Sequence, residues 1–168
     1  MANLSDQEVQ KSIHDFVSEA RQCAQRGNGF AAMSTIFNVV LAVSEAVNGR
    51  QRNKVLFSAF VPELTDKASW LVTPVAAPTD DVIVNILNNI RNGMAHALSL
   101  PENIALVNTI AAARQMANAE PNNYFVSTTD FVDVVEATVA KLRQTYPTAQ
   151  FDPSGSNRGP AAGRTIKI

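Results

Sequence analysis

The sequence FAAMSTIFNVVLAVSEAV, residues 30–47, decides the fold. When it is wound as a helix, this segment is apolar almost all round, and Glu45 is its only charged residue. A helix that is hydrophobic on every side has to be covered by other elements. The segment is therefore predicted to be the central helix of a bundle, and Asn48 and Gly49 are predicted to end it.

A helix is also predicted on the N-terminal side of this segment. Apolar residues recur at spacings of three and four from Val9 to Ala24, which gives one apolar face. Ser5 and Glu8 have the spacing of a capping box, in which each side chain satisfies a free backbone donor of the first turn. Gly27 is predicted to end this helix.

Three further helices are predicted on the C-terminal side. They cover residues 50–61, residues 80 to about 98, and residues 128–146. Pro62 and Pro147 stop the first and the last of these, and Thr79 offers an N-cap to the middle one. The expected fold class is all-α, an up-and-down helical bundle.

Residues 103–127 allow two interpretations. Ile104–Val107 would suit a strand, whereas the alanine-rich residues 111–117 favour a helix. If Ile104–Val107 is a strand, Tyr124–Ser127 could pair with it as a small β-hairpin before the last helix. The sequence leaves helix and hairpin open.

Length and composition suit one domain followed by a tail. The 168 residues can bury a real core. From residue 150 the composition shifts to Pro, Gly, Ser and Ala with a basic excess, which cannot bury much apolar surface. We therefore predict a helical-bundle domain over residues 1–149 and a flexible C-terminal tail over residues 150–168.

Charge and cysteine content exclude several classes of function. Fourteen Lys and Arg against fifteen Asp and Glu give a formal net charge of −1, so strong unspecific nucleic-acid binding is not expected and any RNA contact must be local. A cytoplasmic protein without membrane contact is expected, because the sequence shows no signal-peptide pattern and no membrane-span pattern. The single cysteine, Cys23, excludes an internal disulfide. Neither a metal-ligand pattern nor a phosphate-binding glycine loop occurs in the sequence, so no cofactor or metal is expected.

The sequence NILNNIRNGMAH, residues 85–96, carries the candidate site. On an ideal helix the side chains of Asn85, Asn89, Asn92 and His96 form one polar stripe opposite the apolar face. Arg91 lies about 140° around the helix from His96, so the two do not stack as neighbours. They could meet if the helix distorts near Gly93 or ends there, or if a second chain supplies the complementary group. The other interpretation is a solvated face without a function.

The order Arg91-Asn92-Gly93-Met94-Ala95-His96, late on a bundle helix, resembles the motif of the HEPN superfamily (higher eukaryotes and prokaryotes nucleotide-binding). That motif is an Arg, four to six residues and a His, commonly with Asn after the Arg. The resemblance implies metal-independent cleavage of RNA that leaves 2′,3′-cyclic phosphate ends, in a cleft lined by the motifs of two chains. Toxin or defence proteins of this kind would have single-stranded RNA as substrate and an antitoxin protein as a partner.

The resemblance also implies roles for four residues. His96 would move protons around the ribose 2′-hydroxyl and the leaving oxygen, and Arg91 would stabilise charge on the phosphate. Asn92 would orient the site, and Glu45 would brace the motif from an earlier helix. The alternative from a different class is a non-catalytic dimerisation or partner-binding module that uses the asparagine stripe.

Overall fold

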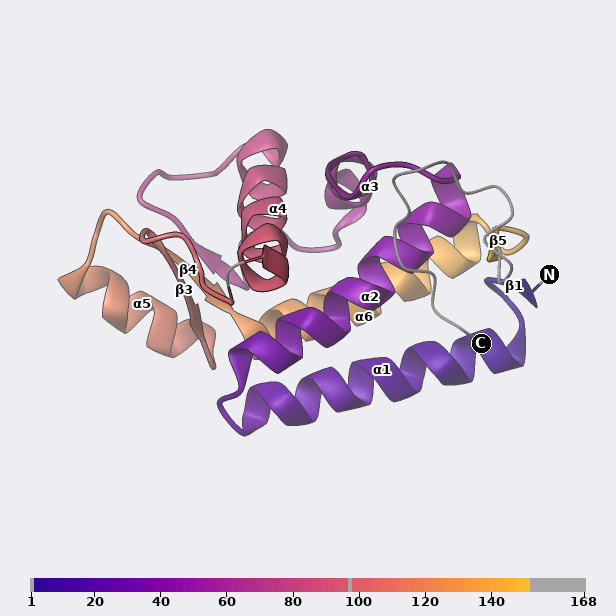
Figure 1. Ribbon diagram of the computed structural model, residues 1–168, viewed down its shortest axis with the longest axis horizontal. Helices are drawn as coiled ribbons and strands as arrows, with labels where there is room; N and C mark the ends of the chain where they lie inside the picture. The colour runs from indigo at the N-terminus through magenta and orange to yellow at the C-terminus, as the bar shows by residue number, and fades with distance from the viewer. Residues whose placement is uncertain (1, 97, 152–168) are drawn as a thin grey trace.

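The computed structural model describes residues 2–96 and 98–151, and Figure 1 shows their arrangement. The helices within these residues are α1 (Gln7–Gln25), α2 (Gly29–Asn48), α3 (Asn53–Phe60), α4 (Asp80–His96), α5 (Ile110–Ala119) and α6 (Thr128–Thr145), with a 3-10 turn at Val61–Glu63. The strands are β1 (Ala2–Asn3), β2 (Leu71–Val72), β3 (Ile104–Val107), β4 (Tyr124–Ser127) and β5 (Gln150–Phe151). The fold is mostly helical with a small sheet, which agrees with the predicted helical bundle in its coarse features.

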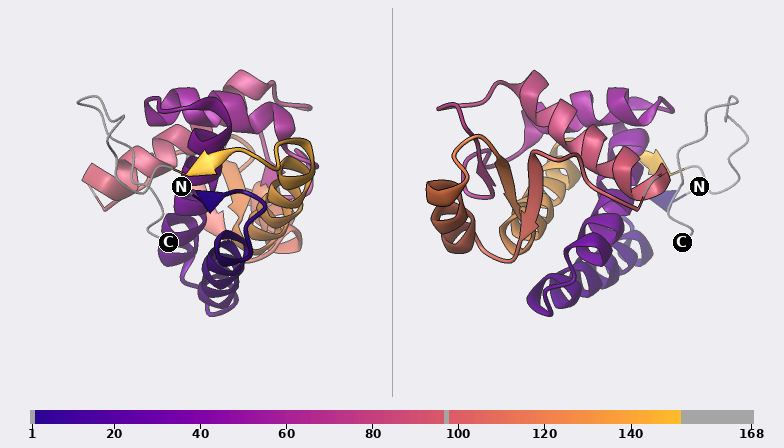
Figure 2. Two further views of the ribbon diagram at one scale, coloured as in Figure 1. Left: turned by 90° about the vertical axis from the view of Figure 1, so that its right-hand side faces the viewer. Right: turned by 60° about the vertical axis from the view of Figure 1, so that its left-hand side comes forward.

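The central element is α2, as its sequence predicts. Ten of its residues are buried. Figures 1 and 2 show α1 on one side of α2 and α3 and α4 on the other, and α6 packs against both α1 and α2. By length and composition α2 is the one helix of the described residues that could cross a membrane, but 56% of that stretch is buried inside the fold. Its apolar surface therefore serves the core, and a cytoplasmic location stays a prediction.

Aromatic rings from α2, α3 and α6 contact one another in the core. Phe37 of α2 meets Phe57 of α3 and Phe131 of α6 edge to face, with ring centroids 5.3 and 6.2 Å apart. Trp70 lies against Phe131 with centroids 4.6 Å apart and is fully buried. Its indole N–H donates to the backbone oxygen of Asp66 at 3.0 Å, so burial leaves no unpaired polar atom on the ring.

The start of α1 differs from the predicted capping box. Asp6, not Ser5, is the N-cap residue, and no side-chain cap bond forms there. The Asp6 carboxylate instead accepts from the backbone N–H of Asn3 at 2.7 Å. The capping box was therefore wrong, because β1 holds the preceding residues and its backbone supplies the competing donor.

The region 103–127 folds as strand, helix and strand, so the strand and the helix that the sequence left open are both formed, but the two strands do not make a hairpin. β3 pairs with β4 in parallel, from Ile104 opposite Tyr124 to Val107 opposite Ser127, and α5 forms the crossover between them. Parallel pairing follows from the intervening helix, because a hairpin requires a short turn. The third strand, β2, pairs antiparallel with the other edge of β4. This sheet lies at the end of the molecule opposite β1 and β5 (Figure 1).

The predicted tail contributes two residues to the fold. Gln150 and Phe151 form β5, which pairs antiparallel with β1, and Phe151 is buried. The boundary predicted at residue 149 therefore falls before residues 150 and 151, which belong to the described fold. The remainder of the predicted tail, 152–168, lies outside the described residues.

Candidate functional site

The motif lies on the C-terminal half of α4, an uninterrupted helix. The backbone N–H of Val82 donates to Thr79 Oγ1 at 3.4 Å, so Thr79 caps the first turn as predicted. The buried face comprises Ile83, Val84, Ile86, Leu87 and Ile90. This apolar face fixes the rotation of α4 about its axis, and it thereby determines where each motif residue points.

The asparagine stripe faces outward. Asn85, Asn89, Asn92 and His96 are all exposed. Asn92 and His96 are four residues apart and therefore lie one turn apart on the same side of the helix. Half of the motif is thus presented to solvent at the end of α4.

Arg91 points a different way. Its side chain is half-buried, and it faces the N-terminus of α3. With the Asn53 amide oriented to satisfy both groups, the Asn53 oxygen accepts from Arg91 Nε at 3.0 Å and from Nη2 at 3.2 Å. The guanidinium is therefore held by a neutral acceptor on a neighbouring helix.

The helix does not distort at Gly93, so it does not bring Arg91 and His96 together. α4 continues through Gly93 to His96. The two motif residues thus keep their separation of about 140° and lie on different sides of the helix. A meeting of Arg91 and His96 through a distortion or an end of the helix at Gly93 is therefore not observed, and the contribution of a second chain stays a prediction.

Glu45 lies on α2, one helical turn beyond Leu41. Its Oε2 is buried and has no hydrogen-bond partner. Within residues 2–96 and 98–151, Glu45 forms no hydrogen bond or ion pair with Arg91, Asn92 or His96, so the bracing role that the resemblance implies stays a prediction.

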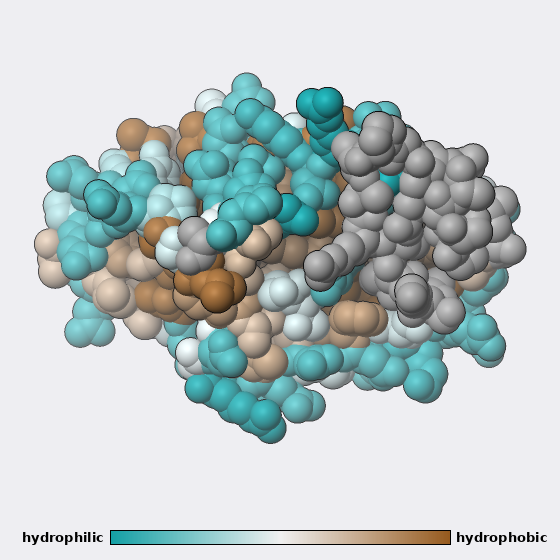
Figure 3. Space-filling view, in the orientation of Figure 1, coloured by the Kyte–Doolittle hydropathy of each residue, from teal (hydrophilic) through white to brown (hydrophobic). Residues whose placement is uncertain are grey.

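A groove runs between α2 and the C-terminal half of α4, beside Arg91. Its volume is about 480 Å³. The groove is lined by Phe30, Ala31, Ser34, Phe37, Asn38 and Leu41 from α2 and by Arg91, Met94, Ala95 and Leu98 from α4 and the residues after it. Figure 3 shows apolar surface beside the lower end of α4, above the start of α2. Two of the lining side chains are strongly exposed for their type, Phe30 at 40% and Leu98 at 84%.

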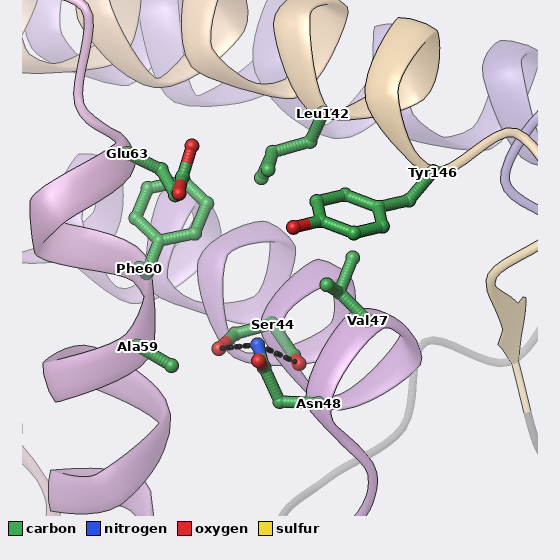
Figure 4. Close-up of a pocket in the computed structure, with 8 residues that line it drawn as sticks. All are labelled: Ser44, Val47, Asn48, Ala59, Phe60, Glu63, Leu142 and Tyr146. Atoms are coloured by element: carbon green, nitrogen blue, oxygen red, sulfur yellow. Dashed lines mark hydrogen bonds between the residues drawn. The ribbon is translucent and has the colours of Figure 1, made fainter.

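A second, smaller pocket lies between α2, α3 and α6 (Figure 4). Its volume is about 40 Å³, which suits a water molecule rather than a substrate. The Asn48 amide donates to the Ser44 backbone oxygen at 3.0 Å, and the Ser44 hydroxyl donates to the Leu56 backbone oxygen at 2.8 Å. The bond from Ser44 to Leu56 joins α2 to α3, so we assign the pocket to the structure of the bundle.

Sequence reasoning did not find the partners of Arg91. Asn53 contacts Arg91 from a different helix, and Phe30 and Asn38 line the groove from α2. A sequence signal for the groove was Asn38, a polar amide in the middle of a mostly apolar helix. No group of three His, Cys, Asp or Glu side chains within residues 2–96 and 98–151 is placed to hold a metal ion.

Comparison of the chain with protein-family models, with curated proteins and with solved structures finds no match to any of them.

Proposed function

We propose that this protein is a HEPN-like, metal-independent endoribonuclease whose active site is composed from two chains of a homodimer. The observation that carries the proposal is the placement of Arg91 and His96 on different sides of one unbroken helix. Two copies of α4 in a homodimer would supply an arginine and a histidine from different chains to the same cleft.

The chemistry of these side chains suits cleavage at the ribose 2′-hydroxyl. One imidazole removes the 2′-hydroxyl proton while the 2′ oxygen attacks phosphorus, and a second imidazole gives a proton to the leaving 5′ oxygen. The products are a 2′,3′-cyclic phosphate and a free 5′-hydroxyl. Each chain supplies one motif histidine, so the dimer supplies the base and the acid.

Arg91 and Asn92 would act on the phosphate and its surroundings. A guanidinium is always charged and offers several donors, which suits the charge that develops on the phosphate oxygens. The amide of Asn92, exposed one turn before His96, would orient the nucleotide or the partner histidine. Glu45 is half-buried on α2 and would brace the motif helix from there rather than touch the substrate.

The substrate would be single-stranded or loop RNA, because its unstacked phosphates can enter a cleft between helices. The net charge of −1 favours a local contact with RNA rather than a broad basic surface. A toxin or defence role, with an antitoxin protein as partner, belongs to the same proposal.

The test is cleavage of a mixed RNA pool in EDTA by the wild type and by the His96→Ala variant. We expect 2′,3′-cyclic phosphate ends from the wild type and a loss of about 100-fold or more in His96→Ala. His14→Ala is the matched control, because His14 is also exposed but lies on α1. An unchanged rate in His96→Ala would refute the site, and no cleavage by the wild type would refute the enzyme.

The second candidate function is a non-catalytic module that dimerises or binds a partner through α4. The uncharged stripe of three exposed asparagines favours it, because a solvent face is more often built from charged residues with higher helix propensity. This function predicts that Asn89→Ala and Asn92→Ala weaken assembly, as measured by light scattering, in a protein that cleaves no RNA.

A further inference from the structure

The groove between α2 and α4 has the chemistry of a nucleotide site. Most of its lining residues are apolar, and three polar side chains reach it: Arg91, Asn38 and Ser34. A volume of about 480 Å³ lies within the range of roughly 300–1,000 Å³ that is usual for small-molecule sites. Mostly apolar walls with a few placed polar groups are typical of sites that bind a small amphipathic ligand.

The polar groups of the groove differ in kind. Arg91 brings a permanent positive charge, which is complementary to a phosphate. Asn38 is half-buried, and no hydrogen bond of its amide is found within residues 2–96 and 98–151. An amide both donates and accepts, so it can pair with the edge of a nucleobase.

Phe30 supplies a surface for stacking. The Phe30 residue is 40% exposed and lines the groove, whereas Phe37, two helical turns further along α2, is buried in the core. An unstacked base gains affinity by lying on an aromatic ring, and every base has a face that can stack. The exposed Leu98 adds apolar surface on the opposite wall.

We propose that this groove binds one unpaired nucleotide of the RNA substrate. The base stacks on Phe30 and pairs with the Asn38 amide, while the phosphate meets Arg91. The inference rests on the proposed function for the identity of the ligand, since the phosphate held by Arg91 is then the one next to the scissile bond. It goes further by placing the base in a groove of the same chain.

Binding of mononucleotides tests the groove without any need for cleavage. The probes are adenosine and uridine 5′-monophosphate, with ribose 5-phosphate lacking the base and adenosine lacking the phosphate. We expect at least one monophosphate to shift the methyl resonances of Leu41, Met94 and Leu98 and to bind about tenfold or more tightly than either control compound.

Variants of the groove sharpen the test. Phe30→Ala should weaken binding roughly 5- to 100-fold. Asn38→Leu, which keeps the volume but removes both hydrogen-bonding groups, should weaken it about tenfold and change the preference between the two bases. Met116→Ala is the matched control, because Met116 is exposed at 42% on α5 and does not line the groove.

The outcomes separate this inference from the proposed function. RNA cleavage without any nucleotide-induced shift of the groove methyls would overturn the groove assignment alone. Nucleotide binding that Phe30→Ala and Asn38→Leu leave unchanged would overturn it as well. Nucleotide binding in the groove of a protein that cleaves no RNA would support the groove and refute the nuclease, and neither binding nor cleavage would overturn both.

Discussion

Gly93 and Ser99 touch backbone to backbone at the centre of the motif. A Cβ atom on Gly93 would lie 2.2 Å from the Ser99 carbonyl oxygen, which is far closer than a carbon and an oxygen that are not bonded can approach. The Ser99 N–H also donates to the Gly93 oxygen at 3.3 Å. The chain therefore returns over the side of α4 directly after the helix ends, and only glycine permits that approach.

Gly93→Ala should destabilise the protein, although the same change inside a helix ordinarily stabilises it by about 1 kcal/mol. Because the clash is with backbone, the segment around Ser99 has to move, at a cost of about 1–3 kcal/mol. Urea unfolding followed by the fluorescence of the buried Trp70 measures the free energy of unfolding. Asn89→Ala, exposed on the same helix, is the control and should be neutral or slightly stabilising. A Gly93→Ala protein as stable as this control would contradict the close approach.

Arg91 and Asn53 should be energetically coupled. A double-mutant cycle of Arg91→Ala and Asn53→Ala should give a coupling free energy of about 1 kcal/mol, because the bidentate hydrogen bond disappears with either partner. The comparison cycle of Arg91→Ala with Asn85→Ala should be additive, since Asn85 is exposed and lies on another side of α4. Equal coupling in the two cycles would refute the contact.

A composite site makes a quantitative prediction for mixed subunits. If one cleft requires His96 from both chains, wild-type and His96→Ala subunits exchanged in equal amounts should retain about one quarter of the wild-type RNA cleavage. Sites that are complete within one chain would retain about one half. The mixture should be equilibrated until subunit exchange is complete, and the ratio of hetero- to homodimer should be checked with tagged chains.

We expect the free energy of unfolding to fall in acid, because the Asp66 carboxylate becomes protonated and loses its hydrogen bonds. Its carboxylate accepts from the backbone N–H groups of Ala68 and Ser69 at 2.8 and 3.0 Å, which lowers the pKa of Asp66 from its ordinary value of 3.8. Since the pKa is lower in the folded chain, this contribution is present above 3.8 and is lost as the pH falls through the lowered folded value.

The Asp66→Asn variant should therefore have a lower free energy of unfolding than the wild type near neutral pH. The difference between the two should shrink as the pH falls to about 2. The difference should be small, because the carboxylate is well solvated. Urea unfolding by Trp70 fluorescence is the measurement, since the indole bonds to the backbone of Asp66 itself. A stability difference that stays constant from about pH 6 to about pH 2 would contradict the assignment.

The helices were predictable because their signals are local. Residues 30–47 are apolar on every side, and the structure buries α2 at the centre. The last helix, predicted over residues 128–146, forms as α6, and its apolar residues from Phe131 to Leu142 include Val135 and Val139 in the core. Thr79 caps the first turn of α4 with its side-chain oxygen, as the sequence predicts. Each of these outcomes depends on residues within a few positions of one another.

The pairing of β3 and β4 was not predictable in the same way. Four-residue strands such as Ile104–Val107 carry no signal for the direction of a partner. Their parallel pairing depends on α5 packing across the sheet and on β2 occupying the other edge of β4. The N-cap of α1 was not predictable for a similar reason. The Asp6 side chain accepts from a backbone N–H of β1, and this bond replaces the local capping pattern.

By itself the sequence determined the helices, the central place of α2 and the composition of the motif on α4, because hydrophobic periodicity and helix-stop residues act over short distances. Only the tertiary structure decided where the motif residues point. The burial of Ile83, Ile86 and Ile90 sets the rotation of α4, which turns Arg91 towards Asn53 and the groove and leaves His96 in solvent. The need for glycine at residue 93 likewise arises from a backbone contact with Ser99 that no local pattern encodes.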